Sequence, residues 1–263
     1  MSRPHLVLGC LAALLVFGVA APAAEAASSV DYVALGDSYS SGVGAPGQTG
    51  LCLRSPNGYP GQWVSRNPPK SFTNLTCSGA ETGDVLSSQA PGIPSGTDLI
   101  SITIGGNDAG FASTVLTCQV SSDAACAQTV ANAEAGISGT LGGKLDTTYA
   151  AIKAKAPSAR VVVLGYPLLF DTTSSYCGLT GMSLAKRKSL NGGAVLLDDL
   201  IKQRAQAAGF TFSDVRDEFA GHGICASSPY LNSLTLSPPQ NSFHPNKNGY
   251  TYGYLPAFSG AIG

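Results

Sequence analysis

Ser38 is the residue of this sequence best placed for nucleophilic chemistry. It lies in the stretch VALGDSYSSGVG, where the apolar run Tyr32 to Leu35 stops at Gly36-Asp37-Ser38 and gives way to small residues. That pattern predicts a strand that delivers a serine to a tight loop. A serine hydroxyl is a poor nucleophile until a positioned base removes its proton, and histidine is the usual base. The first question is therefore which histidine can reach Ser38.

Two histidines lie downstream of Ser38. His244 sits in a proline-containing loop near the end of the sequence, and such a loop can carry a side chain back over a sheet edge. His222 is three residues before Cys225, in a segment that a disulfide would hold, so it can equally be structural. Spacing alone favours His244 only modestly and keeps His222 as the alternative.

Two further positions can stabilise negative charge on an ester oxygen. Gly79 allows a close approach of the backbone, and Asn107 offers an amide NH₂ group after a Gly-Gly turn. Each is weak evidence alone, because glycine after a strand is usually a turn residue and asparagine near glycine usually a cap. For Asp37 and Asp108 we expect hydrogen bonds to loop backbone rather than acid–base chemistry.

The elements that must position these side chains are short apolar runs that read as buried strands. They cover Tyr32 to Leu35, Phe72 to Thr76, Leu99 to Ile104, Arg160 to Leu164 and Phe210 to Phe212. Helical periodicity follows over Val130 to Ile152, weakened by Gly139, Gly142 and Gly143, and over Leu184 to Arg204. Strands alternating with helices predict a mostly parallel sheet covered on both faces, with active groups beyond the carboxyl ends of the strands. Ser38, Gly79 and Asn107 all follow such ends.

The segment before the first strand is typical of an export signal. Arg3 and His5 precede the apolar stretch Leu6 to Ala20, and Ala24-Glu25-Ala26 offers a cleavage site. The alternative, a membrane anchor, needs a longer apolar stretch. We therefore expect residues 1–26 to be a signal peptide, residues 27–263 to be one domain, and the protein to be secreted without a stable membrane anchor.

Removing the signal also removes Cys10 from the 7 cysteines. The even set that remains predicts disulfides, although the sequence does not choose their pairing. No CxxC or close Cys/His pair suggests a metal site, and no cofactor is implied.

The charge of the protein does not indicate a surface that binds nucleic acid, because the net charge is −1 and only 12% of the residues are charged. We expect a monomer.

Four short blocks, taken in order, resemble those of the SGNH hydrolases, also called GDSL lipases and esterases. They are Gly36-Asp37-Ser38, Ser78-Gly79-Ala80, Gly105-Gly106-Asn107-Asp108 and His244-Pro245. The resemblance spans nearly all of residues 27–263 and is greatest to secreted actinobacterial lipases and phospholipases. It implies an α/β fold, a three-layer α/β/α flavodoxin-like sandwich with about five parallel strands. The lack of Gly-x-Ser-x-Gly around Ser38 argues against the α/β-hydrolase elbow.

The same resemblance implies roles for single residues. Ser38 would be the nucleophile and His244 the base, with the Ser38 and Gly79 N–H groups and the Asn107 side chain as oxyanion hole. The segment from Gly221 to Cys225 also matches the family, and this match implies a structural role or a role in the substrate cleft for His222. The implied disulfides are Cys52 with Cys77, Cys118 with Cys126, and Cys177 with Cys225.

The sequence departs from the family where many members have aspartate three residues before the histidine. Here that residue is Asn241, which cannot supply a full negative charge to an imidazolium. Some relatives use a Ser-His dyad with a backbone carbonyl, so we expect the main-chain oxygen of Asn241 or Ser242 to orient His244. The Asn241 side chain and a distant aspartate are the alternatives.

The expected function is a secreted serine ester hydrolase that cleaves lipid carboxylic esters, a lipase or esterase that extends to phospholipase A. Carbohydrate deacetylation on the same fold is the alternative within enzymes. A secreted binding module without turnover is the alternative outside them. Chain length and positional selectivity depend on walls such as Phe111 to Val120 and Leu168 to Leu184, which we expect to be loops. Tyr166, Leu168, Leu169 and Phe170 could line an acyl groove, but an apolar run after a strand more often packs in the core.

Overall fold

The computed structural model describes residue 1, residues 29–178 and residues 181–263. Apart from residue 1, the predicted signal peptide, with Cys10 and its cleavage site, lies outside the described residues. At the centre is a parallel sheet in the order β2-β1-β3-β4-β5. Its strands are β1 (Asp31–Gly36), β2 (Ser71–Asn74), β3 (Leu99–Thr103), β4 (Arg160–Leu164) and β5 (Thr211–Ser213).

The three inner strands are buried on both faces. Tyr32 to Leu35 of β1 are at most 2% exposed, and all of β3 is buried. A strand covered on both faces needs a continuous apolar run rather than an alternating one, which is the pattern the sequence carries. The strand order is the flavodoxin-like one, and both it and the five expected strands are confirmed.

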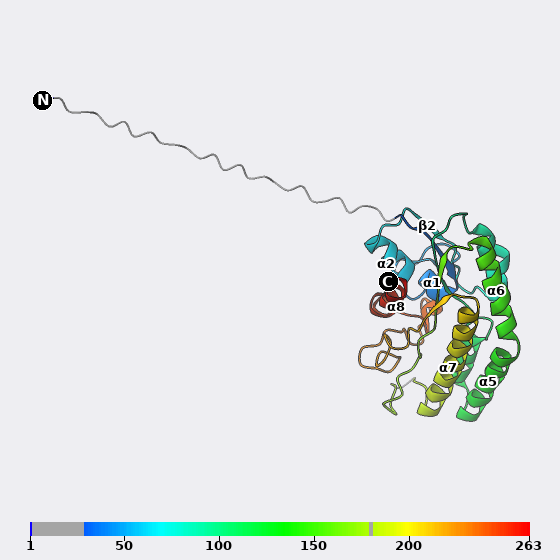
Figure 1. The fold of residues 1–263 in the computed structure, drawn as a ribbon. Helices are drawn as coiled ribbons and strands as arrows, with labels where there is room; N and C mark the ends of the chain where they lie inside the picture. Colours follow the sequence, from blue (N-terminus) through cyan, green and yellow to red (C-terminus); the bar gives the residue numbers. More distant parts are fainter. Residues whose placement is uncertain (2–28, 179–180) are drawn as a thin grey trace.

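Helices cover both faces of the sheet, so the three-layer sandwich is confirmed as well. On one side α5, α6 and α7 pack against one another, and on the other α2 packs against α8 (Figure 1). The helices are α1 (Ser38–Ser41), α2 (Tyr59–Arg66), α3 (Thr82–Asp84), η1 (Val85–Gln89), η2 (Ala90–Gly92), α4 (Phe111–Val120), α5 (Asp123–Gly136), η3 (Ile137–Leu141), α6 (Gly142–Lys155), α7 (Leu184–Ala207), η4 (Pro239–Asn241), η5 (Gly249–Tyr254) and α8 (Leu255–Ile262).

Two segments differ from expectation. Phe111 to Val120 is the helix α4 and not a loop, so that expectation was wrong. The apolar residues of α4 point both into the protein and outward, with Val115 buried and Val120 86% exposed, which hides the helical period. The glycines at 139, 142 and 143 do not stop the preceding helix, because the π-helical turn η3 joins α5 to α6.

Three disulfides join the cysteine pairs that the resemblance implied. They link Cys52 to Cys77, Cys118 to Cys126 and Cys177 to Cys225. The first ties the turn after α1 to the loop after β2, and the third ties the segment before α7 to the segment after β5. The second joins the helices α4 and α5. The expected pairing is therefore confirmed.

Candidate active site

Ser38 is the first residue of α1, directly beyond the carboxyl end of β1. Gly36 closes the strand at φ +114°, where a Cβ atom would lie 2.3 Å from the Thr103 carbonyl oxygen, so only glycine fits. Asp37 then caps α1 by accepting a hydrogen bond from the Tyr39 N–H at 3.0 Å. The Ser38 side chain is held at the rim of a cavity, with the residue 7% exposed.

His244 reaches Ser38 across the carboxyl edge of the sheet. Its Nε2 lies 2.7 Å from Ser38 Oγ, and its Nδ1 lies 2.9 Å from the Ser242 carbonyl oxygen. A carbonyl can only accept, so Nδ1 carries the proton of the neutral ring and Nε2 is left as an acceptor. The Ser38 hydroxyl therefore donates to His244, which is the arrangement that a general base requires.

The surroundings of His244 keep its ring neutral. Burial lowers the pKa of His244 to about 4, against the opposing effect of the backbone carbonyls of Ser242 and Gln240. The Tyr39 ring lies beside the imidazole, with 5.1 Å between ring centroids. At neutral pH the imidazole is therefore free to accept a proton.

The structure shows which of the expected groups accepts a hydrogen bond from the His244 ring. The Ser242 carbonyl accepts the Nδ1–H bond, whereas the Asn241 carbonyl faces the backbone N–H of His244 at 3.3 Å. The Asn241 side chain accepts instead from Gln48 Nε2 at 2.7 Å. Within the described part of the chain, no carboxylate bonds to this ring. The arrangement is a Ser-His pair oriented by a main-chain oxygen.

Three hydrogen-bond donors belong to residues that line the same cavity. The backbone N–H groups of Ser38 and Gly79 have no protein acceptor among the described residues. The Asn107 amide donates one hydrogen to the Ala80 carbonyl at 2.9 Å and keeps its second hydrogen for the cavity. Gly79 has φ +82°, and beyond its two chain neighbours no atom of the described residues lies within 4 Å of the point where a Cβ would stand, so backbone conformation is what favours glycine there. These three donors could stabilise the negative charge of an oxyanion.

The cavity itself is about 230 Å³ in volume and largely apolar. Phe111, Ala112 and Val115 of α4 form one wall, and Phe243 contributes to the other. Ser38 and His244 line the same cavity, together with Gly79 and Asn107. An acyl chain can lie along the apolar walls while its carbonyl meets the serine.

Tyr166, interpreted from the sequence as packing, belongs to this site. Its hydroxyl donates to Asp37 Oδ2 at 2.5 Å and accepts from the Gly106 N–H at 3.1 Å. Asp37 also accepts from Thr103 Oγ1, and burial raises the pKa of Asp37 to about 6 against these bonds. The signal was available in principle, because Tyr166 follows the carboxyl end of β4 just as Ser38 follows β1.

The remaining candidates lie outside the reacting centre. His222 stacks on Tyr230 with centroids 3.8 Å apart, and its Nδ1 meets the Ser228 carbonyl at 2.7 Å. Asp108 accepts from the Thr82 N–H and hydroxyl and pairs with Lys144 at 3.1 Å. Both therefore hold local structure.

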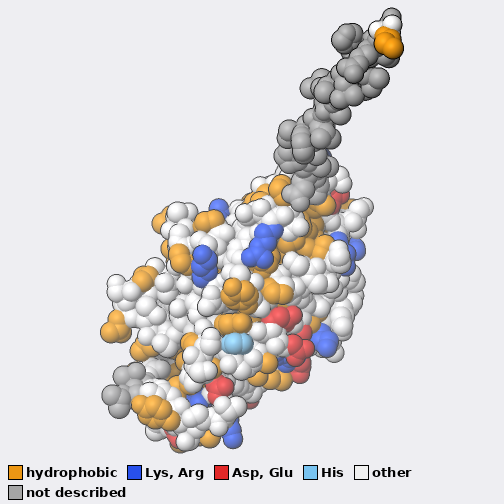
Figure 2. Space-filling view, turned by 90° about the vertical axis from the view of Figure 1, so that its left-hand side faces the viewer, with side chains coloured by type: hydrophobic (Ala, Val, Ile, Leu, Met, Phe, Trp, Pro, Cys, Tyr) orange, Lys and Arg blue, Asp and Glu red, His pale blue; other side chains and the backbone are white. Residues whose placement is uncertain are grey.

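Over residues 29–178 and 181–263, no group of three or more His, Cys, Asp and Glu residues could hold a metal ion. None of the helices in those ranges is both long and apolar enough to cross a bilayer. Figure 2 shows basic and acidic side chains on the same face, and neither sign covers it.

Comparisons of sequence and of structure identify relatives of this chain. Residues 34–252 match the model of the GDSL-like Lipase/Acylhydrolase family. Lipase 1 of Streptomyces coelicolor is 47% identical over 252 residues, which cover 95% of this chain and 93% of that protein. An extracellular lipase from Streptomyces rimosus superposes with a TM-score of 0.85 at 47% identity, over 88% of this chain and 99% of that one. Phospholipase A1 from Streptomyces albidoflavus NA297 gives 0.86 at 43% identity, over 89% and 100%.

Proposed function

The chain belongs to the GDSL-like lipase and acylhydrolase family and is an ester hydrolase, and on that premise we propose that it is a secreted enzyme that cleaves lipid esters through an acyl-Ser38 intermediate. The observation that carries this proposal is the 2.7 Å contact between Ser38 Oγ and His244 Nε2, in a cavity that Gly79 and Asn107 also line. A nucleophile, a base and an oxyanion site within one cavity are what acyl transfer needs.

In the first half-reaction Ser38 Oγ attacks the ester carbonyl carbon while its proton passes to His244 Nε2. The carbonyl π electrons move to oxygen, and the resulting oxyanion is held by the N–H groups of Ser38 and Gly79 and by the Asn107 amide. The Ser242 carbonyl accepts from Nδ1 throughout and keeps the imidazolium oriented. Collapse of the adduct breaks the bond to the alcohol, which leaves with the proton from Nε2.

The second half-reaction repeats this sequence with water. His244 removes a proton from water, the hydroxide oxygen attacks the acyl carbon, and the adduct collapses to the free acid. The proton on Nε2 returns to Ser38 Oγ, so the protein ends as it began. Every proton transfer uses His244 because its Nε2 is in contact with Ser38 Oγ, and its low pKa leaves Nε2 unprotonated at neutral pH.

Lipid esters suit the cavity better than acetate. The walls formed by Phe111, Val115 and Phe243 present apolar surface that an acetyl group leaves largely unused. The names of the Streptomyces relatives, lipases and a phospholipase A1, support the same substrate class. Deacetylation of carbohydrate is the second candidate that the experiment below separates.

Secretion is part of the proposal and rests on the sequence of residues 1–26 together with the S. rimosus relative, which is described as extracellular. Cleavage after Ala26 would release a chain that begins at Ala27. The mass of the protein recovered from the culture medium of an expressing host tests this. A medium-borne protein that retains its first 26 residues would contradict the cleavage site.

The test of function is initial-rate hydrolysis of p-nitrophenyl esters from acetate to palmitate, with Ser38→Ala in parallel. We expect activity on medium and long chains that disappears in the variant. Activity confined to the acetate ester would instead favour deacetylation of carbohydrate. No turnover above that of Ser38→Ala on any ester would contradict ester hydrolysis at this site and favour a binding role.

A further inference from the structure

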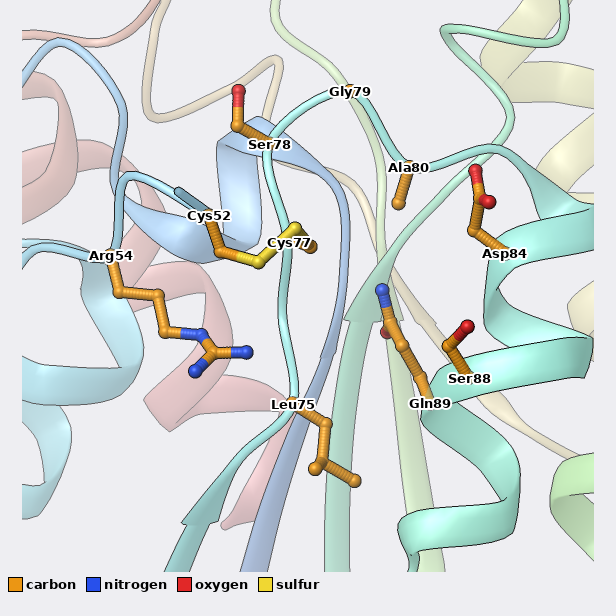
Figure 3. A pocket seen from close by; sticks show the side chains of 10 residues that line it. All are labelled: Cys52, Arg54, Leu75, Cys77, Ser78, Gly79, Ala80, Asp84, Ser88 and Gln89. Carbon is orange, nitrogen blue, oxygen red and sulfur yellow. A yellow bond between two sulfur atoms is a disulfide. The ribbon is translucent and has the colours of Figure 1, made fainter. Parts of the chain in front are cut away.

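A second cavity adjoins the catalytic one across the loop after β2. It is about 370 Å³ in volume, and Ser78 and Gly79 line both cavities. Its other walls come from the turn that contains Cys52, from Leu75 and Cys77, and from α3 and η1 (Figure 3). A molecule whose ester lies at Ser38 therefore has a neighbouring space for the group attached beyond it.

Arg54 places a fixed cation in this second cavity. Its Nε donates to the Thr76 carbonyl at 2.7 Å, and neither Nη nitrogen has a protein acceptor among the described residues. The turn that carries Arg54 is tied to the Ser78-Gly79 loop by the Cys52–Cys77 disulfide and by the bond from Ser78 N–H to the Cys52 carbonyl at 3.1 Å. The two outer nitrogens are thus held near the oxyanion site and remain free to bind an anion.

An anion stands on the other side of the same cavity. Asp84 and Arg54 lie on opposite sides of the chain that runs from Leu75 to Gly79 in Figure 3. Asp84 Oδ2 accepts from the Glu81 N–H at 2.9 Å, while Oδ1 has no protein donor in the described ranges. No ion pair joins Arg54 or Asp84 to another described residue. The cavity therefore presents one unpaired charge of each sign.

We propose that this second cavity binds the zwitterionic phosphodiester headgroup of a glycerophospholipid, with the phosphate at Arg54 and the ammonium group at Asp84. A guanidinium offers two parallel N–H donors that match phosphate oxygens. Asp84 repels headgroups that are purely anionic and attracts those that also carry an ammonium group. The inference rests on the proposed ester hydrolysis at Ser38 and assigns its substrate class.

The two charges can be removed separately. Arg54→Gln removes the phosphate contact, and Asp84→Asn removes the negative charge while keeping an oxygen for the Glu81 N–H. Arg66→Gln, which removes an exposed arginine of α2 that lines neither cavity, is the matched control. Rates are measured on dihexanoyl phosphatidylcholine, dihexanoyl phosphatidylglycerol and p-nitrophenyl butyrate, with the short lipids below their micelle concentrations.

We expect Arg54→Gln to lower kcat/KM for phosphatidylcholine by about tenfold, as for the loss of one charge-assisted contact, with butyrate hydrolysis unchanged. Asp84→Asn should reduce the preference for phosphatidylcholine over phosphatidylglycerol. Arg66→Gln should alter neither rate. An equal loss of kcat/KM on butyrate and on phosphatidylcholine would show that Arg54 supports the loop structure, and it would overturn the proposal. No loss of kcat/KM on either substrate would also overturn it.

Binding separates this inference from the proposed function. The diether analogue of dihexanoyl phosphatidylcholine has no ester to cleave, so its Kd does not depend on turnover. The wild-type protein should bind it about tenfold more tightly than Arg54→Gln does. If the protein hydrolyses butyrate but its binding of the analogue does not depend on Arg54, the headgroup site is contradicted and the proposed ester hydrolysis stands. If binding depends on Arg54 but no ester is hydrolysed, the proposed ester hydrolysis is contradicted and the headgroup site stands.

Discussion

The hydroxyl of Tyr166 joins the loop of Ser38 to the loop of Asn107. It donates to Asp37 Oδ2 at 2.5 Å and accepts from the Gly106 N–H at 3.1 Å, so it touches the residue before each of these two. We therefore expect Tyr166 to help set the distance between Ser38, the proposed nucleophile, and the Asn107 amide, although its hydroxyl bonds to the neighbours of these residues. We infer that Tyr166 is a positioning residue.

Tyr166→Phe should slow the reaction and destabilise the fold. The buried Asp37 carboxylate loses a donor, which raises the pKa of Asp37 further above about 6, and the Gly106 N–H loses its acceptor. We expect a kcat about tenfold lower from the misplaced loops and a free energy of unfolding about 1–3 kcal/mol lower. Kinetics and urea denaturation measure the two effects.

Tyr149→Phe is the matched control for that change. Tyr149 is also fully buried, and its hydroxyl has no hydrogen-bond partner in the described structure. Removing this hydroxyl should leave kcat unchanged and should not lower stability. A Tyr166→Phe protein that behaves like Tyr149→Phe would refute the positioning role.

The acid limb of the pH–rate profile should lie at an unusually low pH for a histidine base. His244 must be neutral to accept the Ser38 proton, so kcat/KM should rise with pH through its pKa of about 4. Because that pKa is below the usual histidine value, the native state binds fewer protons than the unfolded chain between these two values. This group therefore makes the free energy of unfolding rise with pH across that window.

A soluble p-nitrophenyl ester gives the profile, and Asp37→Asn separates the two buried groups. Asp37, with a pKa raised to about 6, titrates in the same range, but the variant cannot. If the acid limb stays near pH 4 in Asp37→Asn, His244 is its source. A limb at the ordinary histidine value in both proteins would contradict the effect of burial.

Asn107→Ala should remove one donor of the oxyanion site. We expect kcat to fall by about 10²–10³-fold, with a smaller change in KM, because the lost hydrogen bond forms with developing charge. Asn191→Ala is the control, since among the described residues Asn191 bonds only the Phe170 backbone, and it lines no wall of the catalytic cavity. It should lose stability and keep kcat. Equal kcat losses in the two variants would argue against a role for Asn107 in the oxyanion site.

The disulfides should differ in their contribution to stability. Cys177–Cys225 closes 48 residues and Cys118–Cys126 closes 8. Loop-closure entropy then predicts losses of about 4 and about 2.5 kcal/mol when each pair is replaced by serine. Calorimetry of the two double variants tests this order. The reverse order would show that native-state contacts outweigh the entropy of the unfolded chain.

The sequence by itself determined the sheet and the ends of its inner strands. Both follow from local features, because a strand buried on both faces requires a continuous apolar run and ends where glycine permits a turn. Ser38, Gly79 and Asn107 could be found in this way, since parallel strands bring their carboxyl ends to one edge. The family resemblance added His244 and the disulfide pairing, which spacing had left open.

Only the tertiary structure decided which atoms face one another. The choice of the Ser242 carbonyl over that of Asn241 depends on the direction of each carbonyl in a folded loop, which composition does not encode. Tyr166 and Asp37 are 129 residues apart, and only the packed strands bring them together. The pKa of His244 likewise depends on the surface that covers its ring. Strand ends are local properties of a chain, whereas hydrogen-bond partners and burial are properties of its packing.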